Sequence, residues 1–131
     1  MRSSLRQVDN PRVQGTLALN RPELRRYLER ISDRWRLDGA YLGGSALTGG
    51  PVEQPLAGPA LGFTVVLVSD AYDEIPWLER VYVATSLWDA LEMGAAADVH
   101  CYTRAEFERK RDSMPAVRDA VWHGLDLLVF I

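Results

Sequence analysis

Two short segments carry residue types that could bind phosphate or a metal ion. Gly44-Ser45 follows an apolar segment. A glycine there lets the backbone approach a ligand while the serine hydroxyl hydrogen-bonds a phosphate, although an ordinary turn is the alternative interpretation. Asp98 and His100 lie two residues apart in a strand-like segment, so their side chains project from the same face. Such a pair suits acid–base catalysis, but we favour a hydrogen-bonded structural histidine because the sequence indicates no nucleophile nearby.

The helix expected before Gly44-Ser45 has clear start and spacing signals. Asn20 can cap it, Pro22 suits its first turn, and Glu23 stands at the capping-box position. Apolar residues then recur every three or four positions, which predicts a helix over residues 20–35 with one buried face. That face is formed by Leu24, Tyr27, Leu28, Ile31 and Trp35.

The remaining elements alternate between strand and helix. The β-branched run around Val65-Val66 predicts a strand buried on both faces, and Thr103 with Glu106 forms a capping box that opens a helix. The order predicts one α/β domain over residues 20–131, a mixed β-sheet with helices packed against it, after an N-terminal arm at residues 1–19. Expected strands are residues 40–42, 61–69, 97–102 and 125–131, and expected later helices are residues 76–93, 104–112 and 115–124.

Composition excludes several classes of protein. The chain has 131 residues and is 47% hydrophobic, which is typical of a globular domain and not of a disordered or fibrous chain. Its apolar runs are too short for a membrane span, and its first residues do not form a secretory signal. The single cysteine, Cys101, excludes an internal disulfide and a cysteine-based zinc site. We therefore expect a soluble, cytoplasmic protein.

Charge is distributed unevenly along the chain. The first 36 residues hold nine arginines and four acidic residues, a net charge of +5, so the rest carries −8 of the total of −3. A basic end can bind nucleic acid or an acidic partner, but we favour a solvated helix face. The sequence has no aromatic-plus-basic pattern of an RNA-binding module, and we expect no sequence-specific nucleic-acid binding. Exposure of Trp77 or Trp122 would instead indicate a surface for a protein partner.

Several segments stand in an order that is typical of one family. They are the helix from Leu24, the segment Tyr41-Leu42-Gly43-Gly44-Ser45-Ala46, the strand ending in Val65-Val66-Leu67-Val68, the segment from Asp98 to Phe107, and the segment from Ser113 to Leu128. In this order and spacing the chain resembles the minimal nucleotidyltransferase family, which has the DNA polymerase β-type fold. The resemblance covers most of residues 24–130 and implies a nucleotidyltransferase-like fold.

The resemblance also implies a mechanism and a ligand set. Family members transfer a nucleoside monophosphate from a nucleoside triphosphate to an acceptor hydroxyl, and three carboxylates on adjacent strands hold two Mg²⁺ ions. The first two carboxylates would fall at Gly62 and Thr64, which carry none, so only the third remains, at Asp98. The resemblance thus implies Asp98 as a residual metal ligand and Gly44 and Ser45 as nucleotide-binding residues. An acid paired with an arginine at a strand end is the structural alternative for Asp98, and we favour it because a lone carboxylate seldom holds Mg²⁺.

Other acids are poor substitutes for the missing pair. Asp70 follows the buried strand and should lie at its far end, about 20 Å from Thr64 along an extended chain. Asp126 stands where the family has its closing strand, and we take its likeness to a catalytic strand as chance. Glu53 lies in a long segment rich in glycine and proline and could fold back.

Three functions remain open from the sequence. The first is a catalytically impaired nucleotidyltransferase-fold protein, a pseudoenzyme that binds a nucleoside triphosphate or a protein. The second is an active enzyme that moves a nucleoside monophosphate from Mg-NTP to a protein or small-molecule hydroxyl, which would need Mg²⁺; otherwise no cofactor is expected. The third is a non-catalytic partner of a helical protein, as in the toxin–antitoxin pairs that the resemblance implies. An oligomer is compatible with all three.

Overall fold

The computed structural model describes residues 19–48 and 62–130. Its first helix, α2 (Arg21–Ser32), begins where the capping signals predict, because the Asn20 side chain accepts a hydrogen bond from the Glu23 amide. The Glu23 carboxylate does not close a capping box; it forms ion pairs with Arg26 and Arg30 at 3.0 and 2.6 Å. The helix is shorter than predicted, yet Trp35 still packs in the core.

A mixed four-stranded sheet forms the centre of the described residues, in the order β3-β2-β1-β4. Strand β1 (Gly39–Gly43) pairs antiparallel with β2 (Phe63–Val68) and with the two-residue β4 (Leu125–Asp126), and β2 pairs in parallel with β3 (Ala97–Tyr102). Helix α3 (Ser45–Thr48) follows β1 directly. This arrangement is the predicted α/β domain with a mixed sheet.

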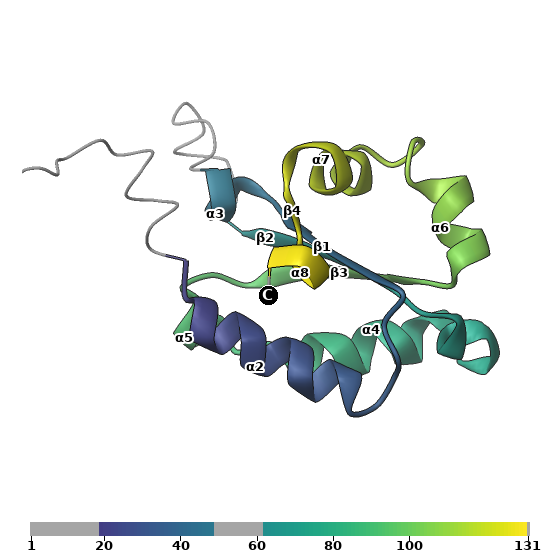
Figure 1. Cartoon of the computed structure of the whole chain (residues 1–131), viewed down its shortest axis with the longest axis horizontal. Helices are drawn as coiled ribbons and strands as arrows, with labels where there is room; N and C mark the ends of the chain where they lie inside the picture. Colours follow the sequence, from purple (N-terminus) through teal and green to yellow (C-terminus); the bar gives the residue numbers. More distant parts are fainter. Residues whose placement is uncertain (1–18, 49–61, 131) are drawn as a thin grey trace, which may run out of the picture.

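Helices cover both faces of the sheet (Figure 1). On one face lie α2, α4 (Trp77–Ser86) and α5 (Ala90–Met93), and on the other lie α6 (Arg104–Lys110) and α7 (Pro115–His123). Side chains alternate along each strand, so β2 sends Val65 and Leu67 into the core against α2 and sends Val66 and Val68 into the core against α6 and α7. The sheet is therefore buried from both sides, as the β-branched run predicts.

The predicted helix over residues 76–93 is wrong in its middle, where the chain breaks into α4 and α5. The Leu87 carbonyl accepts hydrogen bonds from the Arg30 guanidinium, and the Asp89 carboxylate accepts one from the Glu92 amide and so caps a new helix. Two members of the predicted apolar stripe are exposed: Trp77 at 46% and Leu91 at 92%.

The predicted closing strand over residues 125–131 is also wrong beyond its second residue. After Asp126 the chain turns into helix α8 (Leu127–Phe130). The Asp126 carboxylate accepts a hydrogen bond from the Leu128 amide at 3.1 Å, a local contact that favours a turn over a continued strand.

Some predictions fall outside the described residues. These are the N-terminal arm, of which only residue 19 is described, and the glycine- and proline-rich segment that contains Glu53. None of the described helices has the length and apolar character that crossing a bilayer requires.

Candidate functional site

The three positions where the resemblance places carboxylates meet at one end of the sheet. Thr64 of β2 lies directly opposite Asp98 of β3 in the parallel register, and Gly62 precedes β2 by one residue. Because residues two apart share a strand face, Gly62 lies on the same face as Thr64 and Asp98, two residues before Thr64. The Asp98 side chain is 73% exposed. Of the three positions, only Asp98 carries a carboxylate.

Asp98 is held by its neighbour on the same strand face. His100 Nε2 lies 3.0 Å from Asp98 Oδ2, and His100 Nδ1 lies 3.3 Å from the Tyr102 hydroxyl. That hydroxyl donates in turn to the Met114 sulfur at 3.3 Å. His100 and Tyr102 are buried. With both ring nitrogens engaged by protein groups, the geometry favours the structural interpretation of His100 over an acid–base role.

The Gly44-Ser45 turn is attached to the same end of β2. Gly44 has φ of +102°, and a Cβ there would lie 2.6 Å from the Gly62 carbonyl oxygen, so only glycine fits without strain. The Ser45 hydroxyl accepts a hydrogen bond from the Gly62 amide at 3.2 Å, and the Ala46 amide donates to the Gly62 carbonyl at 2.8 Å. The turn therefore lies beside Gly62 and Thr64, and the Ser45 hydroxyl donates to no other described residue.

The side chains at this end do not fit a two-metal site. Magnesium requires oxygen ligands in near-octahedral geometry, usually with anionic carboxylates. Here one carboxylate, Asp98, faces a neutral threonine hydroxyl and a glycine. Throughout the described part of the chain, no group of three or more His, Cys, Asp or Glu side chains could hold a metal ion.

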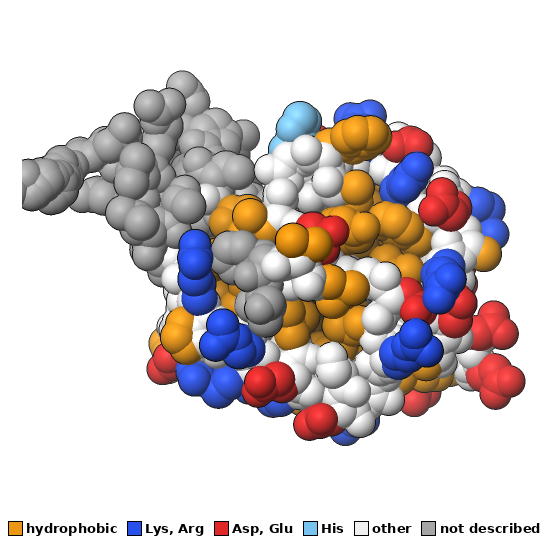
Figure 2. Space-filling model, viewed as in Figure 1, with side chains coloured by type: hydrophobic (Ala, Val, Ile, Leu, Met, Phe, Trp, Pro, Cys, Tyr) orange, Lys and Arg blue, Asp and Glu red, His pale blue; other side chains and the backbone are white. Residues whose placement is uncertain are grey.

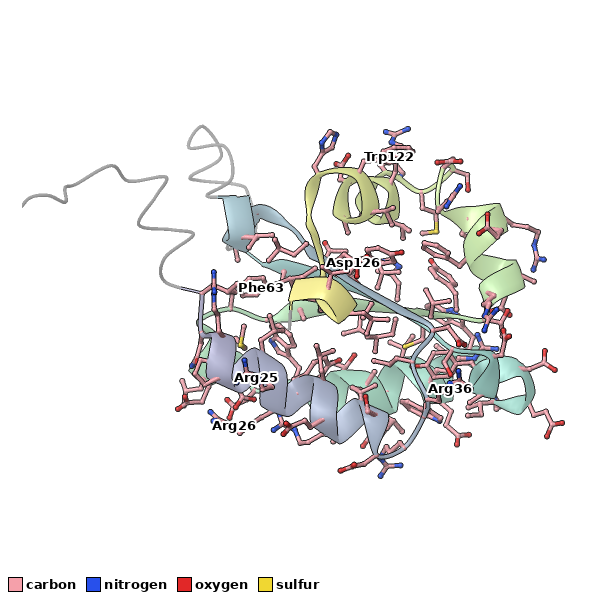
Figure 3. All side chains as sticks on the ribbon, viewed as in Figure 1. Arg25, Arg26, Arg36, Phe63, Trp122 and Asp126 are labelled. Atoms are coloured by element: carbon pink, nitrogen blue, oxygen red, sulfur yellow. The ribbon has the colours of Figure 1, made fainter. Side chains whose placement is uncertain are left out.

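The other acids considered in the sequence lie elsewhere. Asp70 begins η1 (Asp70–Glu74), past the opposite end of β2, where it pairs with Arg104 at 3.5 Å. Asp126 is on β4, three strand spacings from β3, or about 14 Å, and Figure 3 shows it beside β1. Neither can supply one of the carboxylates that are missing beside Asp98.

Two charged clusters that the sequence analysis missed lie at the far end of β3. The Arg80 guanidinium donates to Glu106 at 2.7 Å and thereby lowers the pKa of that carboxyl below its ordinary value. Arg104 donates to Asp38 at 3.0 Å and likewise lowers the pKa of Asp38, with help from the Asp70 amide. Both clusters join elements that are distant in sequence, and no local pattern could reveal them. Their contacts are those of structural ion pairs.

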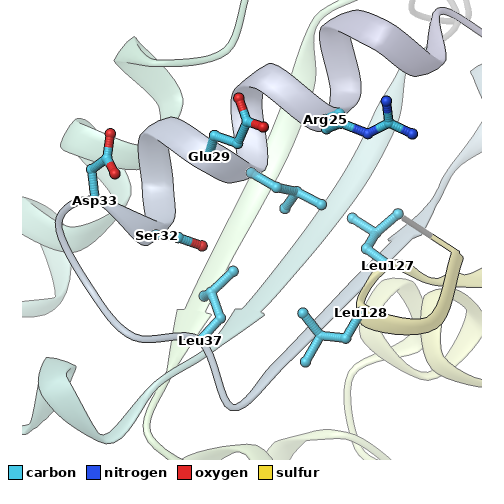
Figure 4. A pocket seen from close by; sticks show the side chains of 8 residues that line it. Arg25, Glu29, Ser32, Asp33, Leu37, Leu127 and Leu128 are labelled. Atoms are coloured by element: carbon cyan, nitrogen blue, oxygen red, sulfur yellow. The ribbon is translucent and has the colours of Figure 1, made fainter.

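A groove that the sequence did not indicate lies between α2 and α8 (Figure 4). Its volume is about 460 Å³, and it is separate from the end of the sheet that carries Asp98. Apolar side chains converge in it from α2, from the segment before β1 and from α8, and polar or charged residues of α2 and its C-cap line its rim. They are Leu28, Leu37, Leu127 and Leu128, with Arg25, Glu29, Ser32 and Asp33. A helix at residues 127–130 is needed to form this groove, and the predicted strand concealed it.

Comparisons with known proteins support the fold and not the chemistry. No family model matches the sequence, and no curated protein matches it. Among solved structures, this chain is similar to the crystal structure of a "putative nucleotidyltransferase" from Sulfolobus solfataricus, with a TM-score of 0.52 and 13% sequence identity. The match covers 78% of this chain and 82% of that chain. At this identity the similarity concerns the path of the backbone alone. The sheet order, the helices on both faces and this structural match together show that the chain has a nucleotidyltransferase-like fold.

Proposed function

We propose that this chain is a catalytically impaired nucleotidyltransferase-fold protein that acts as a binding module. The observation that carries the proposal is the register of Thr64 against Asp98, with Gly62 beside them. The resemblance implies three carboxylates at this end of the sheet, and this chain has only one of them, Asp98. Losing a single preorganised electrostatic contact typically costs roughly 10²–10³-fold in rate, and here two anionic metal ligands are missing.

A transfer assay tests the loss of catalysis. The full chain is incubated with each labelled nucleoside triphosphate and Mg²⁺, alone and with protein and small-molecule acceptors. We expect no label transfer above that of an Asp98→Asn variant. Transfer by the wild-type chain that disappears in Asp98→Asn would contradict the proposal and support the active enzyme.

The ligand of the module is, in our proposal, a nucleoside triphosphate whose phosphates contact the Gly44-Ser45 turn. The Ser45 hydroxyl accepts from the Gly62 amide and donates to no other residue in the described part of the chain. Because Asp98 is the only carboxylate among the three aligned positions, binding should depend little on Mg²⁺. Isothermal titration with ATP, with and without Mg²⁺, should show weak binding that is reduced in Ser45→Ala and retained in Ser45→Thr. Absence of binding by every nucleoside triphosphate would contradict this part.

Restoring the missing acids gives a sharper test. A Cβ at Gly62 would meet only the Ala96 carbonyl oxygen, at 3.5 Å, so a side chain fits there, and Thr64 is only half-buried. The double variant Gly62→Asp/Thr64→Asp should gain Mg²⁺-dependent ATP binding. The matched variant Gly62→Asn/Thr64→Asn, with equal volume and no charge, should not. If the aspartate variant folds and gains nothing, the alignment of these positions with the metal ligands is wrong.

Exposed aromatic side chains favour a second candidate, a non-catalytic partner of another protein. Trp77 on α4 is 46% exposed, and Trp122 on α7, which Figure 3 labels, is 64% exposed. Tryptophan is enriched among the residues that dominate binding at protein interfaces. Purification of the tagged chain from its native host should recover a stoichiometric partner with the wild type and lose it with Trp77→Ala or Trp122→Ala.

A further inference from the structure

The groove between α2 and α8 opens onto an apolar surface that the described residues leave uncovered. Leu28 and Leu127 are buried at its base, whereas Leu128 is 49% exposed and Val129, next to it on α8, is 82% exposed. In Figure 2 apolar side chains gather in the middle of this face, and charged side chains surround them. The face therefore offers both a hollow and protruding apolar side chains beside it.

Charge on the rim of the groove changes sign along α2. Arg25 lies one turn before Glu29, and both are exposed and line the groove. Neither has an ion pair with another described residue, unlike Arg26 and Arg30, which both bind Glu23. Two residues four apart on a helix lie about 6 Å apart along its axis, so the rim presents a positive and a negative charge side by side.

We propose that this face is the interface of a homodimer, with a second copy of the chain as its occupant. A two-fold axis near the middle of α2 would set the helices antiparallel and place Arg25 of each copy opposite Glu29 of the other. The same axis would bring the exposed Leu128 and Val129 of each copy to the groove of its partner. An isologous interface requires a surface that is complementary to itself, and this face combines opposite charges with both a hollow and protruding side chains.

The mixed charge order on the rim favours a second copy over a nucleic acid or an acidic partner. A nucleic acid or an acidic partner would be attracted by Arg25 and repelled by Glu29 and Asp33. A two-fold copy satisfies both signs at once. Association driven by this face stops at two subunits because an isologous contact closes on itself.

Sedimentation equilibrium of the full chain at several concentrations tests the proposal. The wild type should show a reversible species of twice the chain mass of 14.7 kDa. Val129→Asp should give monomer, and Leu91→Asp, which changes a side chain that is 92% exposed on α5, should leave the dimer intact. Circular dichroism of each variant verifies that it is folded.

A charge exchange separates this interface from any other. Arg25→Glu alone should weaken the dimer roughly tenfold, because it sets like charges opposite each other twice. The double variant Arg25→Glu/Glu29→Arg should recover it, because it restores both pairs with the signs reversed. A wild type that is monomeric at all concentrations, a larger open assembly, or a dimer that is insensitive to the groove variants would overturn the proposal.

Discussion

Arg80 is a buried arginine whose guanidinium is held by two backbone carbonyls and one carboxylate. Its side chain donates to the Ile75 carbonyl at 2.8 Å, to the Cys101 carbonyl at 3.2 Å and to Glu106 at 2.7 Å. It thereby links strand β3 to α4 and α6, which lie on opposite faces of the sheet. A buried charge that loses its partner is costly, because its hydration is not restored.

Glu106→Gln should destabilise the fold by roughly 1–3 kcal/mol at neutral pH, since Arg80 would keep its carbonyl partners and lose its anion. The glutamine can still accept from the Thr103 amide and preserve the capping box. Arg80 lowers the folded-state pKa of Glu106, so its stabilisation is complete above the ordinary pKa of 4.5 and is lost as pH falls through the folded value. Urea unfolding should therefore show the variant and the wild type converging below pH 4.5.

Glu108→Gln is the matched control for this measurement. Glu108 is on the same helix, and its only ion pair among the described residues is with Arg111 at 3.8 Å, with its side chain 66% exposed. Its replacement should change the free energy of unfolding little at any pH. Equal effects of the two variants would mean that Arg80 gains nothing from Glu106.

The Cys101 thiol should react slowly with alkylating reagents while the protein is folded. It is completely buried, and burial raises its pKa to about 11. Only the thiolate is nucleophilic, so both access and ionisation are unfavourable at neutral pH. Mass spectrometry after iodoacetamide treatment should show little labelling of the native protein and complete labelling in urea. Rapid labelling without urea would show that β3 opens readily.

Alanine substitutions at two glycines with positive φ measure how firmly the turn between β1 and α3 is held against β2. Gly44 has φ of 102° and Gly94 has φ of 89°. A Cβ at Gly94 would meet nothing within 4 Å, whereas a Cβ at Gly44 would meet the backbone of β2. Gly94→Ala should cost about 1–2 kcal/mol from backbone strain alone, and Gly44→Ala should cost clearly more. Thermal unfolding of both variants gives the difference, and equal costs would mean that the turn is loosely attached.

Elements with local start signals could be predicted from the sequence, and elements that depend on distant contacts could not. Asn20, Thr103 and Pro115 begin α2, α6 and α7 by local rules, and all three predictions are confirmed. The break after α4 depends on Arg30, which is 57 residues before the Leu87 carbonyl that it binds. The contact from Arg30 has no local signal, whereas Asp89 is a local cap signal for the helix that follows the break.

Some features of the candidate site could likewise be predicted from the sequence, and others could not. The resemblance places Gly62, Thr64 and Asp98 at the positions of metal ligands but does not fix the strand register, and the structure pairs Thr64 directly with Asp98. The contact between His100 and Asp98 could be anticipated from their spacing. The groove could not, because an apolar run of four residues is equally compatible with a strand and with a short helix.

The central sheet connects two apolar cores that do not otherwise share side chains. Val65 belongs to the core beneath α2 and α4, and its neighbour Val66 belongs to the core beneath α6 and α7. Both buried tryptophans, Trp35 and Trp88, lie in the first core. Because adjacent residues of one strand serve both cores, neither core should be able to unfold while the other stays intact.

Val117→Ala tests that coupling from the side that has no buried tryptophan. Val117 of α7 is fully buried in the second core, and removing two methyl groups there should cost about 2 kcal/mol. If the sheet couples the cores, the urea midpoint should fall by the same amount whether unfolding is followed by circular dichroism or by the fluorescence of Trp35, Trp77 and Trp88, which all lie on the side of the first core. Trp122→Phe serves as the background, because Trp122 is exposed near Val117 on the same helix and would otherwise report locally. A fluorescence midpoint that stays at the background value while the circular dichroism midpoint falls would mean that the two cores unfold separately.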